Sequence, residues 1–293
     1  MRAGVSTLTA SPARVGDFLE LTKPRITALV LVTAAVGYAV GAGRGLDPSA
    51  FVALLVGTAM VAGGASALNQ YSEREADSRM ERTRRRPLPS GRVTAAEALA
   101  FGLAASGAGL LLLATINLLT AALGAAALGS YVLLYTPLKR LTSLCTVVGA
   151  VPGAIPPLMG WAAARGGLDL PGWTIFAILF LWQLPHFLAI GWIYREDYAR
   201  GGFPMLPVTD SDGSATGRQM MLYSAALVPV TLVAGSLASA GSVYLWSALA
   251  LGLVFFASSA RFFRARSLAA ARLLFLVSIL YLPVVLGLMV FDR

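Results

Sequence analysis

The chain has 293 residues, of which 57% are apolar and only 13% charged, and its mean hydropathy of +0.73 excludes a soluble globular protein. Its formal net charge of +9 does not indicate nucleic-acid binding, because the basic residues lie in short segments between long apolar runs. The single cysteine, Cys145, excludes an intramolecular disulfide and is interpreted as a packing residue inside an apolar run.

Nine apolar runs along the chain are long enough to cross a bilayer, and each is bounded by Gly, Pro or charged residues. The expected spans are 25–43, 51–72, 95–114, 118–135, 145–163, 172–193, 219–237, 243–262 and 270–290. The sequence therefore predicts an all-α membrane protein with nine transmembrane helices around a central chamber. These helices form a single domain over residues 1–293.

The basic residues predict how the helices are oriented. With a cytosolic N-terminus, all but three of the 23 Lys and Arg residues fall on the cytosolic side. The exceptions are Arg44, Arg165 and Arg293. The arm 1–20, which lacks the apolar stretch of a signal peptide, is then cytosolic, and the C-terminus lies on the opposite side. The longest polar segments, 73–94 and 194–218, are expected as cytosolic loops.

The first group of residues that could bind a ligand or take part in catalysis lies at the end of the second run. Asn69, Glu73 and Asp77 are spaced four apart, so they line one face of a helix. A dense arginine segment follows and includes Arg82, Arg85 and Arg86. A solvated helix end before a basic cytosolic loop explains the arginines but not the stacked carboxylates. Mg²⁺ takes one or two carboxylates together with substrate phosphate. The two features together predict an Mg²⁺-bridged diphosphate whose organic tail lies in the membrane.

The fourth run is followed by Lys139 and Arg140, whose positive charges are already explained by the orientation of the helices in the membrane. If a diphosphate binds at this face of the membrane, both side chains are natural ligands for it. The sixth run ends in a second acidic segment, 194–198, with Asp197 and Tyr198. Taken alone this segment is an ordinary helix end, but its position after the sixth run mirrors that of the first group after the second run.

His186 is the only histidine and lies within the sixth run, near Trp182 and Phe187. A single histidine in an apolar helix most often makes a structural hydrogen bond to a neighbouring helix. The functional interpretation is a ligand of a porphyrin iron or a group that handles a proton. Asp210 and Asp212, in the sequence PVTDSDGS, are interpreted as turn residues.

Several of these segments resemble the UbiA-type intramembrane prenyltransferases and, among them, the protoheme IX farnesyltransferases. The segments are LTKPRIT at 21–27, the stretch from Asn69 to Gly91, YTPLKR, GAVPGAIPPLMGW at 149–161, WQLPHF at 182–187, DYARGGFPMLPV at 197–208 and SILYLPV. The chain departs from the family pattern at two positions. Glu73 stands where the family usually has Asp, and Asp197 has Ile193, not Asp, four residues before it.

The resemblance implies the UbiA-type fold and a prenyltransferase domain. It implies transfer of a farnesyl group from farnesyl diphosphate to a vinyl group of protoheme IX, with addition of water, to give haem O and diphosphate. Mg²⁺ is the implied cofactor, and the location is the cell membrane, with the polar loops over the active site. A haem-pathway or terminal-oxidase partner stays open. The catalytic residues are expected to be Asn69, Glu73, Asp77 and Asp197, and the metal ligands among them are Glu73, Asp77 and Asp197. The expected diphosphate ligands are Arg82, Arg85, Arg86, Lys139 and Arg140. The residues expected on the haem side are His186, Trp182 and Tyr198.

Two alternatives stay open from the sequence. One is a UbiA-type enzyme that acts on an aromatic quinone precursor or a chlorin. The other is a secondary transporter, but transporters usually place their ion and substrate sites near the middle of the bilayer. The acidic groups here lie at helix ends on one side of the membrane, which favours an enzyme.

Overall fold

The computed structural model describes residues 14–43 and 45–292, and no strand occurs among them. Within this part of the chain, nine helical segments are long and apolar enough to cross a membrane, which confirms the predicted fold class. The long helices are α2 (Pro24–Ala42), α3 (Pro48–Arg79), α4 (Ala95–Ala114), α5 (Leu118–Gly129), α7 (Cys145–Arg165), α8 (Leu170–Ile193), α11 (Ser214–Leu237), α12 (Ser242–Ala265) and α13 (Leu268–Phe291). The short ones are α1 (Val15–Leu21), the π-helical turn η1 (Ser130–Tyr135), α6 (Thr136–Leu138), α9 (Arg195–Arg200) and α10 (Leu206–Thr209), and η1 and α6 complete the α5 span.

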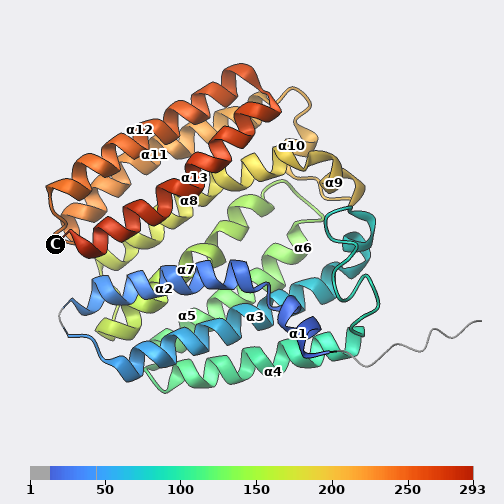
Figure 1. Cartoon of the computed structure of the whole chain (residues 1–293), viewed down its shortest axis with the longest axis horizontal. Helices are drawn as coiled ribbons and strands as arrows, with labels where there is room; N and C mark the ends of the chain where they lie inside the picture. The colour runs from blue at the N-terminus through green and yellow to red at the C-terminus, as the bar shows by residue number, and fades with distance from the viewer. Residues whose placement is uncertain (1–13, 44, 293) are drawn as a thin grey trace, which may run out of the picture.

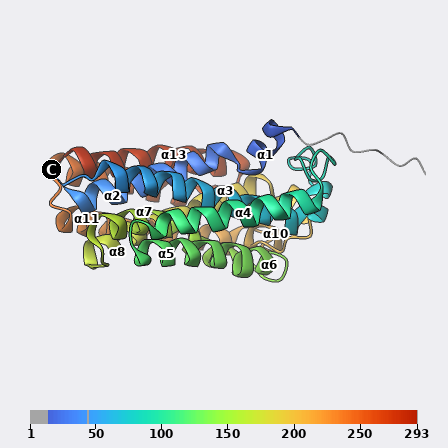
Figure 2. The same ribbon diagram turned by 90° about the horizontal axis from the view of Figure 1, so that it is seen from below.

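The helices run side by side in one bundle (Figures 1 and 2). Helices α11 and α13 pack against α8 on one side, with α12 packed on α11 and α13, while α2, α3, α4, α5 and α7 form the other side. Helix α1, the segment after α3, and helices α9 and α10 lie at one end of the bundle, and the C-terminus lies at the other (Figure 1). The two acidic segments therefore meet at the same end, as their positions in the sequence predict.

Polar residues at the ends of the apolar runs determine where the helices begin. Asp47 precedes α3, and its Oδ1 accepts from the backbone amides of Ser49 (2.8 Å) and Ala50 (3.3 Å). Asn117 caps α5 by accepting from the Thr120 amide at 2.8 Å. Such caps satisfy backbone N–H groups that have no partner within the helix.

The boundaries of the two predicted loops were wrong. The segment from 73 to 79 is helical, because α3 continues to Arg79. Hydropathy marks where the bilayer core ends, but Glu, Arg, Ala and Ser all tolerate a helix well, so the helix continues into the polar region. The segment 194–218 likewise contains α9, α10 and the start of α11. The first part of the predicted N-terminal arm, residues 1–13, lies outside the described residues.

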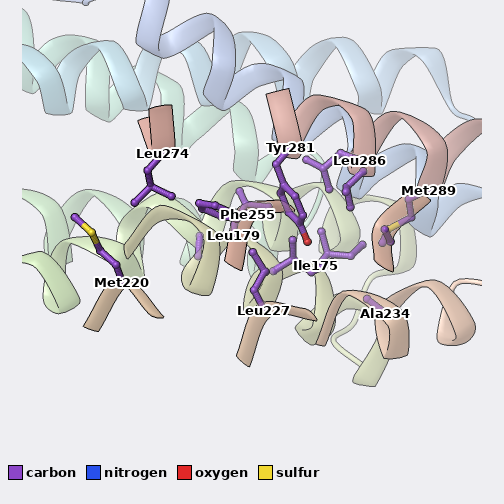
Figure 3. Close-up of a cluster of buried hydrophobic side chains, with 14 of the residues drawn as sticks. Ile175, Leu179, Met220, Leu227, Ala234, Phe255, Leu274, Tyr281, Leu286 and Met289 are labelled. Carbon is purple, nitrogen blue, oxygen red and sulfur yellow. The ribbon is translucent and has the colours of Figure 1, made fainter. Parts of the chain in front are cut away.

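The largest buried apolar cluster joins α8 to α11, α12 and α13 (Figure 3). Phe255 and Tyr281 pack at 5.4 Å between ring centroids in its centre. The Tyr281 hydroxyl and Thr231 Oγ1 are hydrogen-bonded at 2.8 Å, and Tyr244 donates to the Thr231 carbonyl at 2.8 Å. Two tyrosines thus fix the relative positions of three helices while their rings fill the core.

Helices α2 and α7 cross at glycines. A Cβ atom at Gly160 would lie 2.0 Å from the Ala34 carbonyl oxygen, and one at Gly37 would lie 1.9 Å from the Pro157 carbonyl oxygen. Both obstacles are backbone atoms, so no rotamer change relieves them. Small residues allow this close backbone approach, which is a common packing mode of membrane helices.

We expect Gly160→Ala to destabilise the protein by about 2 kcal/mol or more, because the added methyl group forces α2 and α7 apart. Thermal unfolding in detergent measures the effect. Gly107→Ala, in α4, is the matched control, since nothing lies within 4 Å of a Cβ there. Equal unfolding midpoints for the two variants would show that the crossing of α2 and α7 is looser than described.

Candidate active site

Asn69, Glu73 and Asp77 lie on one face of α3, as their spacing predicts. They occupy successive turns of the helix, and their exposed fractions are only 2%, 2% and 0%. Buried ionised groups are costly unless they are paired, so each of these side chains needs partners from other segments. Those partners define the site.

Asn69 joins the start of α2 to α6. Its Oδ1 accepts from Lys23 Nζ at 3.2 Å, and its Nδ2 donates to Thr136 Oγ1 at 3.1 Å. Lys23 directly precedes Pro24, the first residue of α2, and has a left-handed backbone conformation (φ 49°). We did not predict Lys23 as a site residue. The lysine of LTKPRIT was visible in the sequence, but nothing local indicates that it reaches a side chain 46 residues away.

Glu73 is paired with Lys139, a predicted diphosphate ligand. Lys139 Nζ donates to both carboxylate oxygens of Glu73 at 3.1 Å. Burial lowers the pKa of Lys139, but the Glu73 carboxylate outweighs that effect, so the pKa lies above its usual value. The ammonium group also lies 4.6 Å from the ring centroid of Phe203 and 5.7 Å from that of Tyr135. Aromatic faces thus surround a charge pair at the end of the bundle.

Asp77 has one oxygen paired and one unpaired. Its Oδ2 accepts from Arg86 Nη1 at 2.7 Å, whereas its buried Oδ1 has no hydrogen-bond partner among the described residues. Thr83 holds the intervening turn by donating to the Asp77 carbonyl at 2.8 Å. A buried carboxylate oxygen without a donor is the group that a hard divalent cation requires. The donors present therefore fit the magnesium ion that the sequence predicts.

The site carries an excess of positive charge. Three cationic side chains, Lys23, Arg86 and Lys139, surround the carboxylates of Glu73 and Asp77. Burial and the nearby positive charge of Arg86 together lower the pKa of Lys23 to about 7, against the opposing effect of Glu73. An anionic ligand is favoured in this environment, because it restores the charge balance.

The second acidic segment packs onto the first. Asp197 Oδ1 accepts from the Glu81 amide at 3.2 Å, and Asp197 is paired with Arg200. Burial raises the pKa of Asp197, but the hydrogen bonds from Arg200 and from the Glu81 amide outweigh it and lower the pKa. Arg82 Nη2 donates to the Tyr198 hydroxyl at 3.2 Å. The two predicted segments are therefore in contact through both backbone and side chains.

Some predicted residues do not join this cluster. Arg85 is exposed, and its carbonyl accepts from Arg92. Arg140 is exposed and donates to the Ser72 carbonyl at 3.1 Å. Within residues 14–43 and 45–292, no group of three or more His, Cys, Asp or Glu residues is arranged to hold a metal. The predicted joint ligand set of Glu73, Asp77 and Asp197 is therefore not preformed, because Asp197 is held by Glu81 and Arg200.

The turn assignments of the other two aspartates are confirmed. Asp212 Oδ1 accepts from the Ser214 amide at 3.1 Å, and Asp210 Oδ2 accepts from the Thr216 amide at 2.7 Å. Both carboxylates therefore accept hydrogen bonds from amides in the first turn of α11.

The π-helical turn η1 supplies two aromatic residues that sequence analysis missed. Tyr131 and Tyr135 stack at 5.4 Å between centroids, and Tyr135 packs against α7 where a Cβ at Gly149 would lie 2.6 Å from its ring. Single π-helical turns in α-helices occur frequently at functional sites. The spacing of residues in the sequence does not reveal the π-turn, although Tyr135 lies four residues before Lys139 and thus one helical turn away.

His186 lies within α8, seven residues before the end of that helix at Ile193, or roughly 10 Å along the axis. Its Nδ1 is 2.7 Å from Ser278 Oγ on α13. Trp182 stacks on the imidazole at 4.7 Å between centroids, and its Nε1 donates to the Ser278 carbonyl at 2.8 Å. The structural interhelical bond that sequence analysis left open is present, and it leaves one ring nitrogen for another role.

Comparison with known proteins agrees with this geometry. The model of the UbiA prenyltransferase family matches residues 30–282. A protein named protoheme IX farnesyltransferase from Solibacter usitatus is 50% identical over 94% of this chain and 98% of its own length. A protein of the same name from Myxococcus xanthus is 47% identical over 96% of each chain.

Solved structures show the same fold at low sequence identity. A digeranylgeranylglyceryl phosphate synthase structure superposes with a TM-score of 0.81 at 17% identity, covering 95% of this chain and 98% of that one. A UbiA homologue from Archaeoglobus fulgidus bound to GPP and Mg²⁺ gives a TM-score of 0.71 at 15% identity, covering 93% and 99%. Together with the nine membrane-spanning helices and the family match over most of the chain, these similarities show that the protein belongs to the UbiA prenyltransferase family, in its protoheme IX farnesyltransferase subfamily.

Proposed function

We propose that the protein transfers a farnesyl group from farnesyl diphosphate to a vinyl group of protoheme IX, with addition of water, and so forms haem O and diphosphate. The observation that carries the proposal is the convergence of Lys23, Arg86 and Lys139 on the buried face of α3. The names of relatives that match almost their full length support protoheme IX as the acceptor. They weigh against a quinone precursor or a transport function.

The cationic side chains bind and stabilise the leaving diphosphate. Lys139 and Arg86 are paired with Glu73 and Asp77, respectively. When the donor binds, its phosphate oxygens take over these donors, and Lys23 supplies a third positive charge. Preorganised cations of this kind stabilise the negative charge that develops on the diphosphate as the allylic C–O bond breaks.

Asp77, Glu73 and Asn69 are the residues that would hold Mg²⁺. Asp77 provides its unpartnered Oδ1, Glu73 lies one turn earlier on the same face, and Asn69 contributes an amide oxygen. When bound, Mg²⁺ neutralises charge on the diphosphate as a Lewis acid. Asp197 completes this ligand set only if Arg200 moves away, because the two are paired.

The acceptor reaction takes place deeper in the bundle. The farnesyl cation is shielded from water by aromatic side chains, of which Tyr135 and Phe203 lie beside Lys139. A vinyl group of the porphyrin attacks the cation, and water then adds to the porphyrin-side cation with loss of a proton. His186 and Trp182 are the haem-side residues, and Tyr198 positions Arg82 near the diphosphate. We place the protein in the cell membrane with the site facing the cytosol, where farnesyl diphosphate and protoheme IX reach it.

The direct test incubates purified protein with farnesyl diphosphate, protoheme IX and Mg²⁺ and analyses the haems by mass spectrometry. We expect haem O, together with diphosphate. Geranylgeranyl diphosphate in place of farnesyl diphosphate tests the preferred length of the prenyl donor. A hydroxybenzoate in place of protoheme IX tests the alternative that the acceptor is a quinone precursor. Prenylation of the hydroxybenzoate without any haem O would overturn the proposal.

Asp77→Asn should reduce turnover by about 10²-fold or more, because it removes the buried charge that faces the diphosphate site. Asp212→Asn is the matched control, since Asp212 is paired with Arg266 near the same end but is exposed. The rate of haem O formation measures both variants. Undiminished wild-type activity in excess chelator would rule out the metal-dependent mechanism.

Glu73→Gln should abolish activity and also destabilise the protein by about 3 kcal/mol, because Lys139 is left buried without a partner. Adding Lys139→Met should restore much of the thermal stability but none of the activity. Glu73→Asp, which introduces the usual family residue, should stay active. Activity in Glu73→Gln would show that Glu73 only pairs Lys139 and holds no metal.

Lys23→Gln should raise the KM for farnesyl diphosphate by about tenfold, which corresponds to the loss of one charge-assisted hydrogen bond. Arg25→Gln is the control, because Arg25 is an exposed cation on the same helix. Steady-state kinetics with varied donor concentration separates KM from kcat. An unchanged KM would mean that Lys23 only positions Asn69.

A further inference from the structure

The environment of His186 defines which of its ring nitrogens carries a proton. Ser278, which is fully buried, places its Oγ 2.7 Å from His186 Nδ1 and 2.6 Å from the Phe275 carbonyl oxygen. Two oxygen acceptors do not approach to 2.6 Å without a hydrogen between them, so the single hydroxyl proton of Ser278 points to Phe275. The serine oxygen then accepts from His186, and Nδ1 carries the proton. In the neutral imidazole, Nε2 has an unshared electron pair.

Aromatic rings and one hydrogen bond hold the imidazole of His186 in place. Trp182 and Phe275 both stack on the imidazole, at 4.7 and 5.1 Å between centroids and with interplanar angles of 22° and 27°. Nδ1 is occupied by Ser278. His186 itself is only partly buried, and its one hydrogen bond within the described residues is made by Nδ1.

Hydrogen bonds of α8 locate the imidazole relative to two other helices. Gln183 Nε2 donates to the Ala150 carbonyl on α7 at 2.7 Å, whereas Trp182 and His186 bond to Ser278 on α13. The imidazole therefore lies on the side of α8 between α7 and α13. Both of these helices contact α2, and Val36 and Val40 of α2 pack against the same apolar cluster. Helix α2, whose start carries Lys23, thus packs beside both helices that flank His186.

We infer that Ser278 is a positioning residue that holds His186 with its proton on Nδ1, so that Nε2 ligates the iron of the porphyrin acceptor. A neutral imidazole nitrogen is a common protein ligand of haem iron, and a hydrogen bond at the other nitrogen orients such ligands. The identity of the ligand rests on the proposed function, whereas the protonation state of His186 does not. Ligation would fix the porphyrin relative to the diphosphate end of the bundle.

The first experiment measures the tautomer without any substrate. Because His186 is the only histidine, protein labelled with ¹⁵N-histidine and purified without a histidine tag gives two imidazole nitrogen resonances. We expect a protonated Nδ1 and an unprotonated Nε2 in the wild type. Ser278→Ala should move both resonances towards an average of the two tautomers, and Ser278→Thr, which keeps the hydroxyl, should restore them. A protonated Nε2 in the wild type, or an unaltered spectrum in Ser278→Ala, would overturn the inference.

The second experiment uses ferric protoheme IX alone as the probe and records optical and electron paramagnetic resonance spectra. We expect an imidazole-ligated signature in the wild type and its loss in His186→Ala. Ser278→Ala should weaken haem affinity about tenfold, as is typical when the partner of a ligating histidine is removed. Farnesyl diphosphate affinity should stay unchanged in all of these variants. A wild-type haem spectrum in His186→Ala would refute ligation.

Ser259→Ala is the matched control, because Ser259 is equally buried and its hydroxyl donates to the Phe255 carbonyl of its own helix. Ser259→Ala should leave the ¹⁵N and haem spectra unchanged. Thermal unfolding checks that Ser278→Ala is as stably folded as Ser259→Ala. If haem O forms but the spectra show no ligation of haem iron by His186, the inference is refuted and the proposed function is not. Ligated haem with no farnesyl transfer would refute the proposed function and leave the iron ligand in place.

Discussion

The burial of two carboxylates on α3 is the constraint on which the organisation of the active end depends. Glu73 and Asp77 are almost completely removed from solvent, and an ionised group in that position is tolerated only with charged or hydrogen-bonding partners. These partners come from the segments after α3 and after α6, while Lys23 at the start of α2 holds the neighbouring Asn69. The need to pair the charges therefore draws three connecting segments together over one helix end, where the ligand then finds its donors already assembled.

Much of this fold was predictable from the sequence, because hydropathy and residue spacing are local properties. The nine spans follow from apolar length, and the shared face of Asn69, Glu73 and Asp77 follows from their four-residue spacing. The partners were not predictable in this way. Lys23 and Asn69 are 46 residues apart, and Glu73 and Lys139 are 66 residues apart, so only the packing of the helices decides that they meet. Hydropathy likewise missed the polar last turns of α3 and the π-turn η1.

The two ends of the proposed reaction are stabilised by different physical means. At the proposed diphosphate end, Glu73 and Asp77 are held by ion pairs, and one oxygen of Asp77 has no hydrogen-bond partner among the described residues. Around His186, by contrast, stacked rings and a hydrogen bond to Ser278 hold a single orientation. Such a division suits a bimolecular reaction in which one substrate must be ionised while the other is held still.

Helix α3 has 32 residues and is therefore about 48 Å long, well beyond the ~30 Å of a bilayer's hydrocarbon core. With its apolar part across the hydrocarbon core, its carboxylates would lie at the level of the lipid headgroups, where an amphiphile such as farnesyl diphosphate would place its diphosphate. The donor need not leave the leaflet to react. After transfer, the small anion departs into water while the farnesylated porphyrin remains in lipid. The two products thus partition into separate phases at the moment they form, and this separation opposes the reverse reaction without any further input of energy.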